Sequence, residues 1–341
     1  MTDQSIGRRE RRRKTWSAFG NLGRKPNDYE VVTHNMNHTT GAVPLEMGPD
    51  VHGNLWLTQY RDKIDLKVSN WDEFRDPDQM TYTKYMQAQD EQETYIDSLL
   101  QQYTEVRGSD GKLSHEALLF LKLCLTPTRY LVHGHQMISA YLQQLANSSY
   151  VATCAAFQTA DQLRRVQRIA YRTKQLDITH PTYGFGSTER HSWETDPLWQ
   201  PLRNAVETLL VTFEWDQAFI ANNFVVKPIC DEIFLKHFSR VAEQLSDPLD
   251  SLIAENLYRD AERARRWSIA ACKHAIANDQ ANRAVLMKIL ANWQNAGEEI
   301  IEAGVRMITR ETPQIGSGAI EAEIRNFWKT MQTSAGLRHD A

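Results

Sequence analysis

The stretch TADQLRRVQ, residues 159–167, lies in the middle of a long segment whose apolar residues recur at helical spacing. The stretch RDAERARRW, residues 259–267, repeats its Asp-x-x-Arg pattern in a second such segment. Asp161 and Asp260 are each followed three residues later by an arginine, Arg164 or Arg263. Such pairs usually form exposed ion pairs within one helix. Their recurrence in two long helices favours a structural role that the two segments share.

The spacing of these motifs matches the metal-binding helices of a di-iron four-helix bundle. In such a bundle two helices each contribute a Glu-x-x-His pair, and two other helices each add a glutamate. The active pattern reads Asp-Glu-x-Arg-His, so the ligand positions here are filled by Gln162 and Arg165, and by Ala261 and Ala264. Amide and guanidinium groups are poor or impossible iron ligands, and alanine offers none. The sequence therefore predicts a bundle whose own metal site is vestigial.

Length and composition are typical of a large helical protein with a buried core. The chain has 341 residues, of which 41% are hydrophobic, and a net charge of −4, which argues against nucleic-acid binding through bulk charge. No apolar run approaches the roughly 20 residues that span a bilayer. Its four cysteines lie far apart in apolar helical segments, as expected of buried thiols in a reducing compartment. We expect a cytoplasmic protein that binds neither membrane nor nucleic acid.

The periodicity predicts long helices from residue 79 onward, and no stretch is convincing as a strand. The expected ranges are 80–106, 113–146 with a kink at Pro127 unless a new segment begins there, 150–177, 198–222, 228–245, 248–277, 281–309 and 319–332. We expect a loop at 178–197, and a cap from Asp76 or Asp78 on the first long helix. This gives an extended N-terminal arm at 1–78, a helical domain at 79–310 and a C-terminal tail at 311–341.

The N-terminal region lacks steady periodicity and opens with a basic run from Arg8 to Lys14. A basic segment that contacts nucleic acid or anionic lipid is one interpretation. We favour an arm that lies over a partner subunit, because large aromatic side chains along a polar segment serve as anchors. The candidate anchors are Trp16, Tyr29, Trp56, Tyr60 and Trp71.

Other possible metal ligands are few. None of the eleven histidines follows a glutamate by three residues, which removes the standard ferritin-like iron site. His133 and His135 are two residues apart, so on a helix they point about 200° away from each other. The nearest relative of the ligand pattern is Asp177 with His180. A ferritin-like iron oxidase with displaced ligands, drawn from His133, Asp177, His180 and Glu214, is the alternative interpretation.

Several longer stretches resemble one known family. They are KTWS at 14–17, KP at 25–26, NLW at 54–56, QYR at 59–61, NWD at 70–72, DPDQ at 76–79, YLQQ at 141–144, QTAD at 158–161, AYRT at 170–173, VVKP at 225–228 and DAER at 260–263. Through them the chain resembles, from about Lys14 to Ile308, the beta subunit of the hydroxylase component of bacterial multicomponent monooxygenases. The resemblance is to the branch that acts on toluene, alkenes and isoprene.

The resemblance implies an all-α, ferritin-like helical bundle with an extended N-terminal arm. It implies a non-catalytic structural subunit with no catalytic residue, cofactor or metal of its own, and a di-iron centre in a paralogous catalytic alpha subunit. The implied assembly is a dimer of alpha-beta-gamma units that oxidises alkenes or aromatic hydrocarbons with O2. A coupling (effector) protein, a Rieske ferredoxin and an NADH reductase would act on it.

In that assembly Gln162, Arg165, Ala261 and Ala264 would fill the former metal cavity. The Asp161–Arg164 and Asp260–Arg263 pairs would be retained from the metal-binding scaffold. The basic start and the tail after about Thr309 depart from what is expected of the toluene branch, so the hydrocarbon is left open.

Overall fold

The structure is a computed structural model that describes residues 19, 22–34, 36 and 50–338. Every regular element within these ranges is helical, which confirms the expected all-α fold. The α-helices are α1 (Asp28–Thr33), α2 (His52–Leu57), α3 (Tyr82–Leu100), α4 (His115–Cys124), α5 (Thr128–Gln144), α6 (Ser149–Thr179), α7 (Glu189–Thr195), α8 (Gln200–Leu210), α9 (Trp215–Ile220), α10 (Lys227–Asp231), α11 (Phe238–Gln244), α12 (Pro248–Asn278), α13 (Ala281–Asn292), α14 (Gln294–Ile308) and α15 (Ser317–Ser334).

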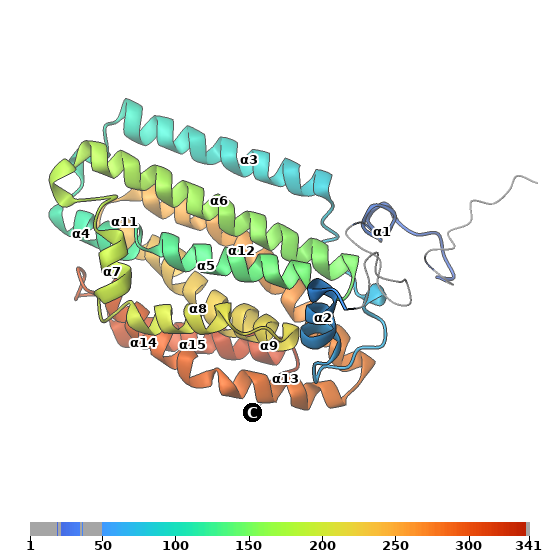
Figure 1. Cartoon of the computed structure of the whole chain (residues 1–341). Helices are drawn as coiled ribbons and strands as arrows, with labels where there is room; N and C mark the ends of the chain where they lie inside the picture. Colours follow the sequence, from blue (N-terminus) through green and yellow to red (C-terminus); the bar gives the residue numbers. More distant parts are fainter. Residues whose placement is uncertain (1–18, 20–21, 35, 37–49, 339–341) are drawn as a thin grey trace, which may run out of the picture.

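A bundle of long segments forms the centre of the molecule. They are α5, α6, α12 and the unbroken run from α9 to α11. Figure 1 shows α3, α6 and α5 lying one beside another, with α12 behind them and α13, α14 and α15 along the opposite side. The run from α9 to α11 lies within this arrangement and packs against α12, α14 and α8. The centre of the bundle is therefore enclosed by helices on several sides.

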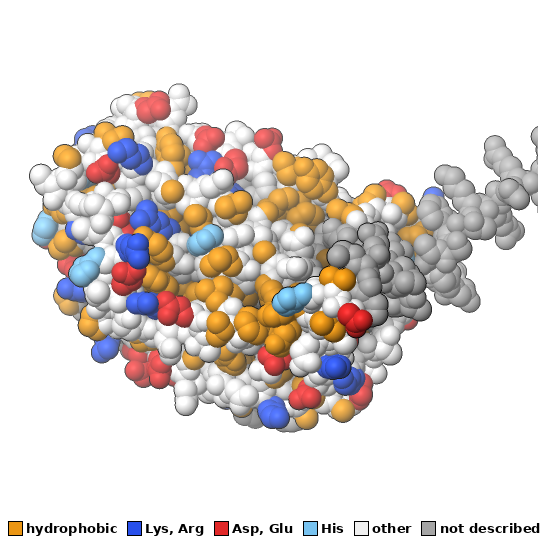
Figure 2. All heavy atoms as spheres, in the orientation of Figure 1, with side chains coloured by type: hydrophobic (Ala, Val, Ile, Leu, Met, Phe, Trp, Pro, Cys, Tyr) orange, Lys and Arg blue, Asp and Glu red, His pale blue; other side chains and the backbone are white. Residues whose placement is uncertain are grey.

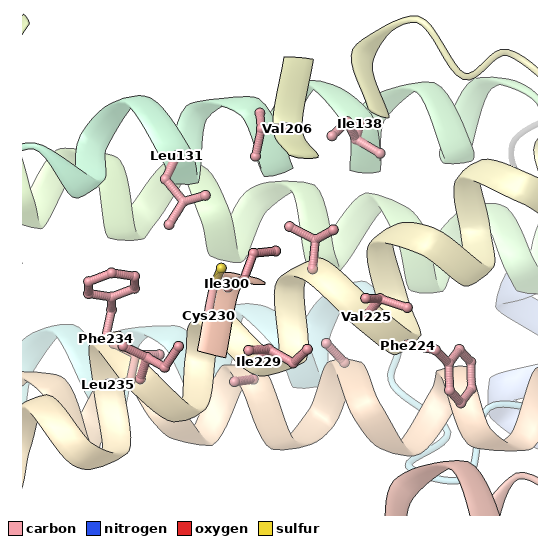
Figure 3. Packing of buried hydrophobic residues seen from close by; sticks show 14 of the residues in the cluster. Leu131, Ile138, Val206, Phe224, Val225, Ile229, Cys230, Phe234, Leu235 and Ile300 are labelled. Carbon is pink, nitrogen blue, oxygen red and sulfur yellow. The ribbon is translucent and has the colours of Figure 1, made fainter. Parts of the chain in front are cut away.

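Apolar residues at helical spacing explain why the run from α9 to α11 is buried. Figure 3 shows Phe224, Val225, Ile229, Cys230, Phe234 and Leu235 of this run packed near Leu131 and Ile138 of α5, Val206 of α8 and Ile300 of α14. Nearly every residue from 215 to 239 is buried. The large apolar side chains of this run explain its burial, and buried polar residues in it, among them Asn222, Lys227 and Asp231, are hydrogen-bonded within the bundle.

The structure corrects two helix boundaries in this region. A break was expected between 222 and 228, but residues 215–244 are continuous, and the chain breaks at 211–214 instead. The π-helical turns η7 (Ala221–Val226) and η8 (Glu232–His237) flank α10 and keep the run unbroken. Pro228 stands in the first turn of α10, directly after η7, where the hydrogen-bond register is already shifted.

Smaller corrections concern helix ends. At Pro127 a new segment, α5, begins instead of a kink, which is the second of the two outcomes expected there, and the last long helix is interrupted at Trp293. The loop at 178–197 contains the short helix α7. The cap of α3 is Thr81, whose hydroxyl accepts the Lys84 amide at 3.2 Å, whereas Asp76 accepts the Met80 amide just before the helix. Aspartate and threonine side chains can both accept a backbone amide at the start of a helix, and here Asp76 does so in the turn that precedes it.

Candidate functional site

The two Asp-x-x-Arg motifs meet at the centre of the bundle, on α6 and α12. Their four charged side chains are buried, each at most 8% exposed. Arg263 Nη2 donates to Asp161 Oδ1 at 2.5 Å, and Arg164 Nη1 donates to Asp260 Oδ2 at 2.8 Å. Arg263 also reaches Asp260 of its own helix at 3.0 Å. The main pairing is thus exchanged between the helices, so each motif neutralises the other and clamps α6 to α12.

Helix α3 completes this clamp with polar side chains. The Tyr85 hydroxyl donates to Asp161 Oδ1 at 2.9 Å, and the amides of Gln89 and Gln92 donate to Asp260 Oδ1 at 3.0 and 3.3 Å. The sequence interpretation missed these three residues as members of the site. Their spacing of four and three residues was a detectable signal, because it places them on one face of a helix.

Burial makes the Asp161 carboxylate expensive to ionise. Burial first, and then the neighbouring charge of Asp260, raise the pKa of Asp161 to about 7, although Arg263 and Tyr85 act in the opposite direction. The ordinary value is 3.8. The folded protein therefore holds the Asp161 proton over a pH range in which the unfolded chain has already released it.

This difference predicts a pH dependence of stability with a definite sign. Between about pH 4 and pH 7 the folded state binds one proton more than the unfolded state, so the free energy of unfolding falls as pH rises. The slope attributable to Asp161 is at most about 1.4 kcal/mol per pH unit. We expect the stability of wild type relative to Asp161→Asn to decline from pH 5 to pH 7 and to level off above that. Urea unfolding of both proteins at each pH measures it.

Asp231→Asn is the matched control for that experiment. The pKa of Asp231 is raised by burial but lowered more by Lys227 and Arg165, so it lies below its ordinary value. Its contribution to stability is fully present above the unfolded pKa and is lost only at more acidic pH. The difference between wild type and Asp231→Asn should therefore be constant from pH 5 to pH 8. A difference for Asp161→Asn that is equally constant contradicts the assignment of the titration to Asp161.

The four vestigial ligand positions also face the interior of the bundle. Gln162, Arg165, Ala261 and Ala264 are all buried. Arg165 Nη1 donates to Asp231 Oδ1 at 2.9 Å, and the buried Gln162 Oε1 has no hydrogen-bond partner. Ala264 borders two small cavities of about 10 Å³ each. Ala264 thus leaves space that the longer side chain of a metal ligand would fill.

Other buried polar side chains lie beside these positions. Lys227 of α10 donates from Nζ to Asp231 Oδ2 at 2.6 Å, and both side chains are nearly inaccessible. His135 of α5 donates from Nδ1 to Asn222 Oδ1 at 2.8 Å, and burial lowers the pKa of His135 to about 4. A divalent iron here would meet one carboxylate, an ammonium and a guanidinium, and these do not form a set of donors for iron. The residues present do not fit a di-iron centre.

The alternative ligands are not brought together either. His133 is exposed, whereas the neighbouring His135 is buried. Asp177 accepts from Lys174 at 2.7 Å, and His180 Nε2 lies 2.7 Å from the Asp110 carbonyl. Glu214 precedes the first residue of α9. Within the described part of the chain, no group of three or more His, Cys, Asp or Glu side chains is arranged to hold a metal ion.

The structure places the aromatic residues of the N-terminal segment mostly within this chain. The rings of Tyr29 and Trp71 are 3% and 8% exposed, so they contact their own chain. Trp56 donates from Nε1 to the Tyr141 hydroxyl at 2.9 Å. Trp56 and Tyr60, both partly exposed, pack around Phe213. Trp16 and the basic run from Arg8 to Lys14 lie outside the described residues.

One outer face of the bundle is rich in exposed apolar side chains. On α6 the exposed positions 163, 167, 170, 171, 174 and 178 form one stripe along the helix. Three of them are large and hydrophobic: Leu163, Tyr171 and Ile178, at 46%, 49% and 70% exposure. Figure 2 shows a different group of hydrophobic side chains in the middle of the view, over α5, α8 and α2 of Figure 1, with most charged ones toward the left side and rim. In the described ranges, no helix has the length and apolar character needed to cross a membrane.

Comparison with known proteins shows the family to which this chain belongs. Residues 56–279 match the family described as methane/phenol/alkene hydroxylase. The chain belongs to this family. It is 39% identical, over 87% of its own length and 91% of the relative, to the hydroxylase component subunit beta of the toluene-4-monooxygenase system of Ectopseudomonas mendocina. This methane/phenol/alkene hydroxylase chain is thus of the beta-subunit type, a part of a multicomponent monooxygenase.

Two further relatives of this hydroxylase chain agree. A solved structure of toluene 4-monooxygenase with toluene bound in its resting active site superposes with a TM-score of 0.82 at 37% identity, covering 89% of this chain and all of the other. The oxygenase component of a Pseudomonas phenol 2-monooxygenase is 22% identical over 94% of each chain. The predicted family and helical-bundle fold are confirmed.

Proposed function

We propose that this chain is the non-catalytic structural beta subunit of a di-iron hydroxylase whose metal centre lies in a separate catalytic alpha subunit. One observation carries the proposal: the positions from which a metal-binding bundle would present its ligands hold Gln162, Arg165, Ala261 and Ala264. The complex would insert one oxygen atom of O2 into an alkene or aromatic hydrocarbon. The names of the toluene and phenol monooxygenase relatives support this reaction class.

The assembly that we propose is a dimer of alpha-beta-gamma units. Electrons from NADH would reach it through a reductase and a Rieske ferredoxin, and a coupling protein would dock on the hydroxylase. Within it, the crossed pairs of Asp161, Arg164, Asp260 and Arg263 would make this bundle a rigid support for the catalytic subunit. Four buried free cysteines accord with a cytoplasmic location.

The proposed contact surface for the catalytic subunit is the exposed stripe of α6. Large apolar side chains left exposed together on one helix face are costly in water and are typical of a subunit interface. Leu163 lies at the centre of this helix and has few charged neighbours along the stripe, whose only charged member is Lys174. Such a surface suits a partner of similar apolar character better than a highly charged one.

Iron analysis of the separated subunits tests whether the metal is bound by the catalytic subunit and not by this chain. We expect the purified hydroxylase to contain iron in proportion to its largest subunit, and this chain to contain none after the subunits are separated without chelators. The replacements Asp177→Asn and His180→Gln should leave the iron content of the complex unchanged. Stoichiometric iron in this chain, lost in either variant, would instead support an iron oxidase with displaced ligands.

Truncation of the N-terminal segment tests the proposed arm. Residues 28–34 must stay, because Tyr29 and the fully buried Glu30 anchor them to the bundle, with Glu30 held by Arg24 and Arg75. Removing residues 2–18 is therefore the sharper experiment. We expect this deletion to weaken co-purification of the catalytic subunit severalfold while the circular dichroism spectrum of the chain is preserved. Full recovery of the partner at normal stoichiometry would remove these residues from the interface.

A further inference from the structure

Helix α10 turns two oppositely charged side chains into the bundle core. Lys227 and Asp231 are four residues apart, so they lie on the same face of the helix. The π-helical turns η7 and η8 stand directly before and after α10. Each π turn adds a residue to the local register, which fixes the direction in which the intervening face points. Here that face points at the vestigial ligand positions.

The charges at this place form a closed group of three. Asp231 Oδ2 accepts from Lys227 Nζ at 2.6 Å, and Asp231 Oδ1 accepts from Arg165 Nη1 at 2.9 Å. All three side chains are at most 5% exposed. A carboxylate removed from water in this way is stable only when cations are held against it.

A small cavity beside the Lys227 side chain shows that this residue lies next to a former ligand position. Lys227 and Asp231 line a cavity of about 10 Å³ together with Ala264, where a metal-binding bundle would carry a ligand, and with Asn223, Ser268 and Gln158. The volume is close to that needed by one water molecule, and the lining is polar. An ammonium group has three N–H donors, so such a water would satisfy a donor that Asp231 does not use.

We propose that the ammonium group of Lys227 is a built-in cation that replaces the metal ion of the bundle core and holds Asp231 ionised. The side chain supplies the positive charge that the missing metal would have supplied, and its four-carbon stem fills the space that the metal's ligands would have taken. This inference goes beyond the proposed structural role. It does not depend on which subunit holds iron, because its test measures the stability of this bundle and not its metal content.

Chemical complementation tests the proposal. Lys227→Ala removes three methylene groups and the ammonium, which together correspond to n-propylammonium. We expect the hydroxylase that carries Lys227→Ala to lose roughly 5–10 °C in its midpoint of thermal unfolding, as for removal of one partner of a buried ion pair. n-Propylammonium chloride should recover much of this loss, whereas sodium chloride at the same ionic strength should not.

Two control variants separate the effect of the Lys227 charge from the effect of filling space. Lys227→Met keeps the stem without the charge, so it should be destabilised and should not respond to n-propylammonium. Lys236 pairs with Glu232 at the same i, i+4 spacing in the next turn but is one-third exposed, so Lys236→Ala should lose little and should not respond either. If Lys227→Met is as stable as wild type, Lys227 only fills space and the proposal fails.

A double-mutant cycle covers the case in which Lys227→Ala does not fold. Lys227→Met and Asp231→Asn should each lower the unfolding midpoint, and the double variant should be lowered by clearly less than the sum of the two. Additive losses would overturn the proposal, because they would mean that the ammonium does not act on Asp231.

Discussion

Replacing Arg172 with methionine is expected to produce a large loss of stability in this protein. Arg172 on α6 is 2% exposed and is the centre of a buried ionic group. Its Nε and Nη2 atoms donate to both oxygens of Asp250 at 2.9 and 2.7 Å. Its Nη1 and Nη2 atoms donate to both oxygens of Asp110 at 2.9 and 3.0 Å. One guanidinium thus joins α6, the start of α12 and the turn before α4.

Methionine matches the stem of Arg172 but leaves its two partner carboxylates without a cation. A third carboxyl, Asp247, adjoins them, and burial already raises its pKa, with the charge of Asp250 adding to the effect. Removing one partner of a buried ion pair typically costs about 3–5 kcal/mol. We expect Arg172→Met to lower the free energy of unfolding by about that amount, measured by urea unfolding, and to reduce the yield of folded protein.

Arg168→Met is the matched control for this prediction. Arg168 precedes Arg172 by one helical turn and pairs with Glu93 and Asp97, whose side chains are 36% and 66% exposed. Exposed pairs of this kind contribute about 0.2–1 kcal/mol. Equal losses for Arg168→Met and Arg172→Met would show that burial of the carboxylates does not decide the cost.

A charge placed on the outer stripe of α6 is expected to separate the subunits without unfolding this chain. Leu163 is 46% exposed in the isolated chain, so Leu163→Glu should fold normally. In the proposed interface the new carboxylate would be buried without a partner, which costs several kcal/mol. Because each 1.4 kcal/mol is a factor of ten, we expect association with the catalytic subunit to weaken roughly a hundredfold. Co-purification and analytical ultracentrifugation measure this loss.

Val211→Glu is the control for the interface prediction. Val211 is also large, apolar and exposed, at 64%, but it lies in the break between α8 and α9 and not on α6. The same change of charge there should leave association unaltered. If both variants assemble normally, the catalytic subunit docks on another face of the bundle. If both fail to assemble, the effect reports the added charge and not the position of the stripe.

Much of the fold could be predicted because helical periodicity is a local property. The ranges of α3, α6, α12 and α15 agree with the sequence prediction to within a few residues, apart from the π-helical turn that continues α3. The break before Trp215 could not be predicted in the same way. There the Phe213 carbonyl accepts a hydrogen bond from the Tyr141 hydroxyl at 2.8 Å, a contact between residues far apart in the chain. Residue propensities and local spacing carry no information about a contact between residues that are distant in the chain.

The residues at the former ligand positions could be predicted from the sequence, but the pairs that the buried charges form could not. The absence of Glu-x-x-His and the presence of Gln162, Arg165, Ala261 and Ala264 can be read directly from the sequence. The roles of Lys227 and Asp231 could not be, because their relevance depends on π-helical turns that rotate one helix face toward another. Those turns have no simple signature in residue type.

The sequence by itself determined the helical class, the family and the identity of the groups at the former ligand positions, because these follow from residue type and short-range spacing. Only the tertiary structure decided which arginine pairs with which aspartate. Asp161 is paired with Arg263 and Asp260 with Arg164, across two helices whose motifs are about a hundred residues apart. A buried carboxylate must be matched by the nearest cation in space, and the folded packing of α3, α6, α10 and α12 alone sets that distance.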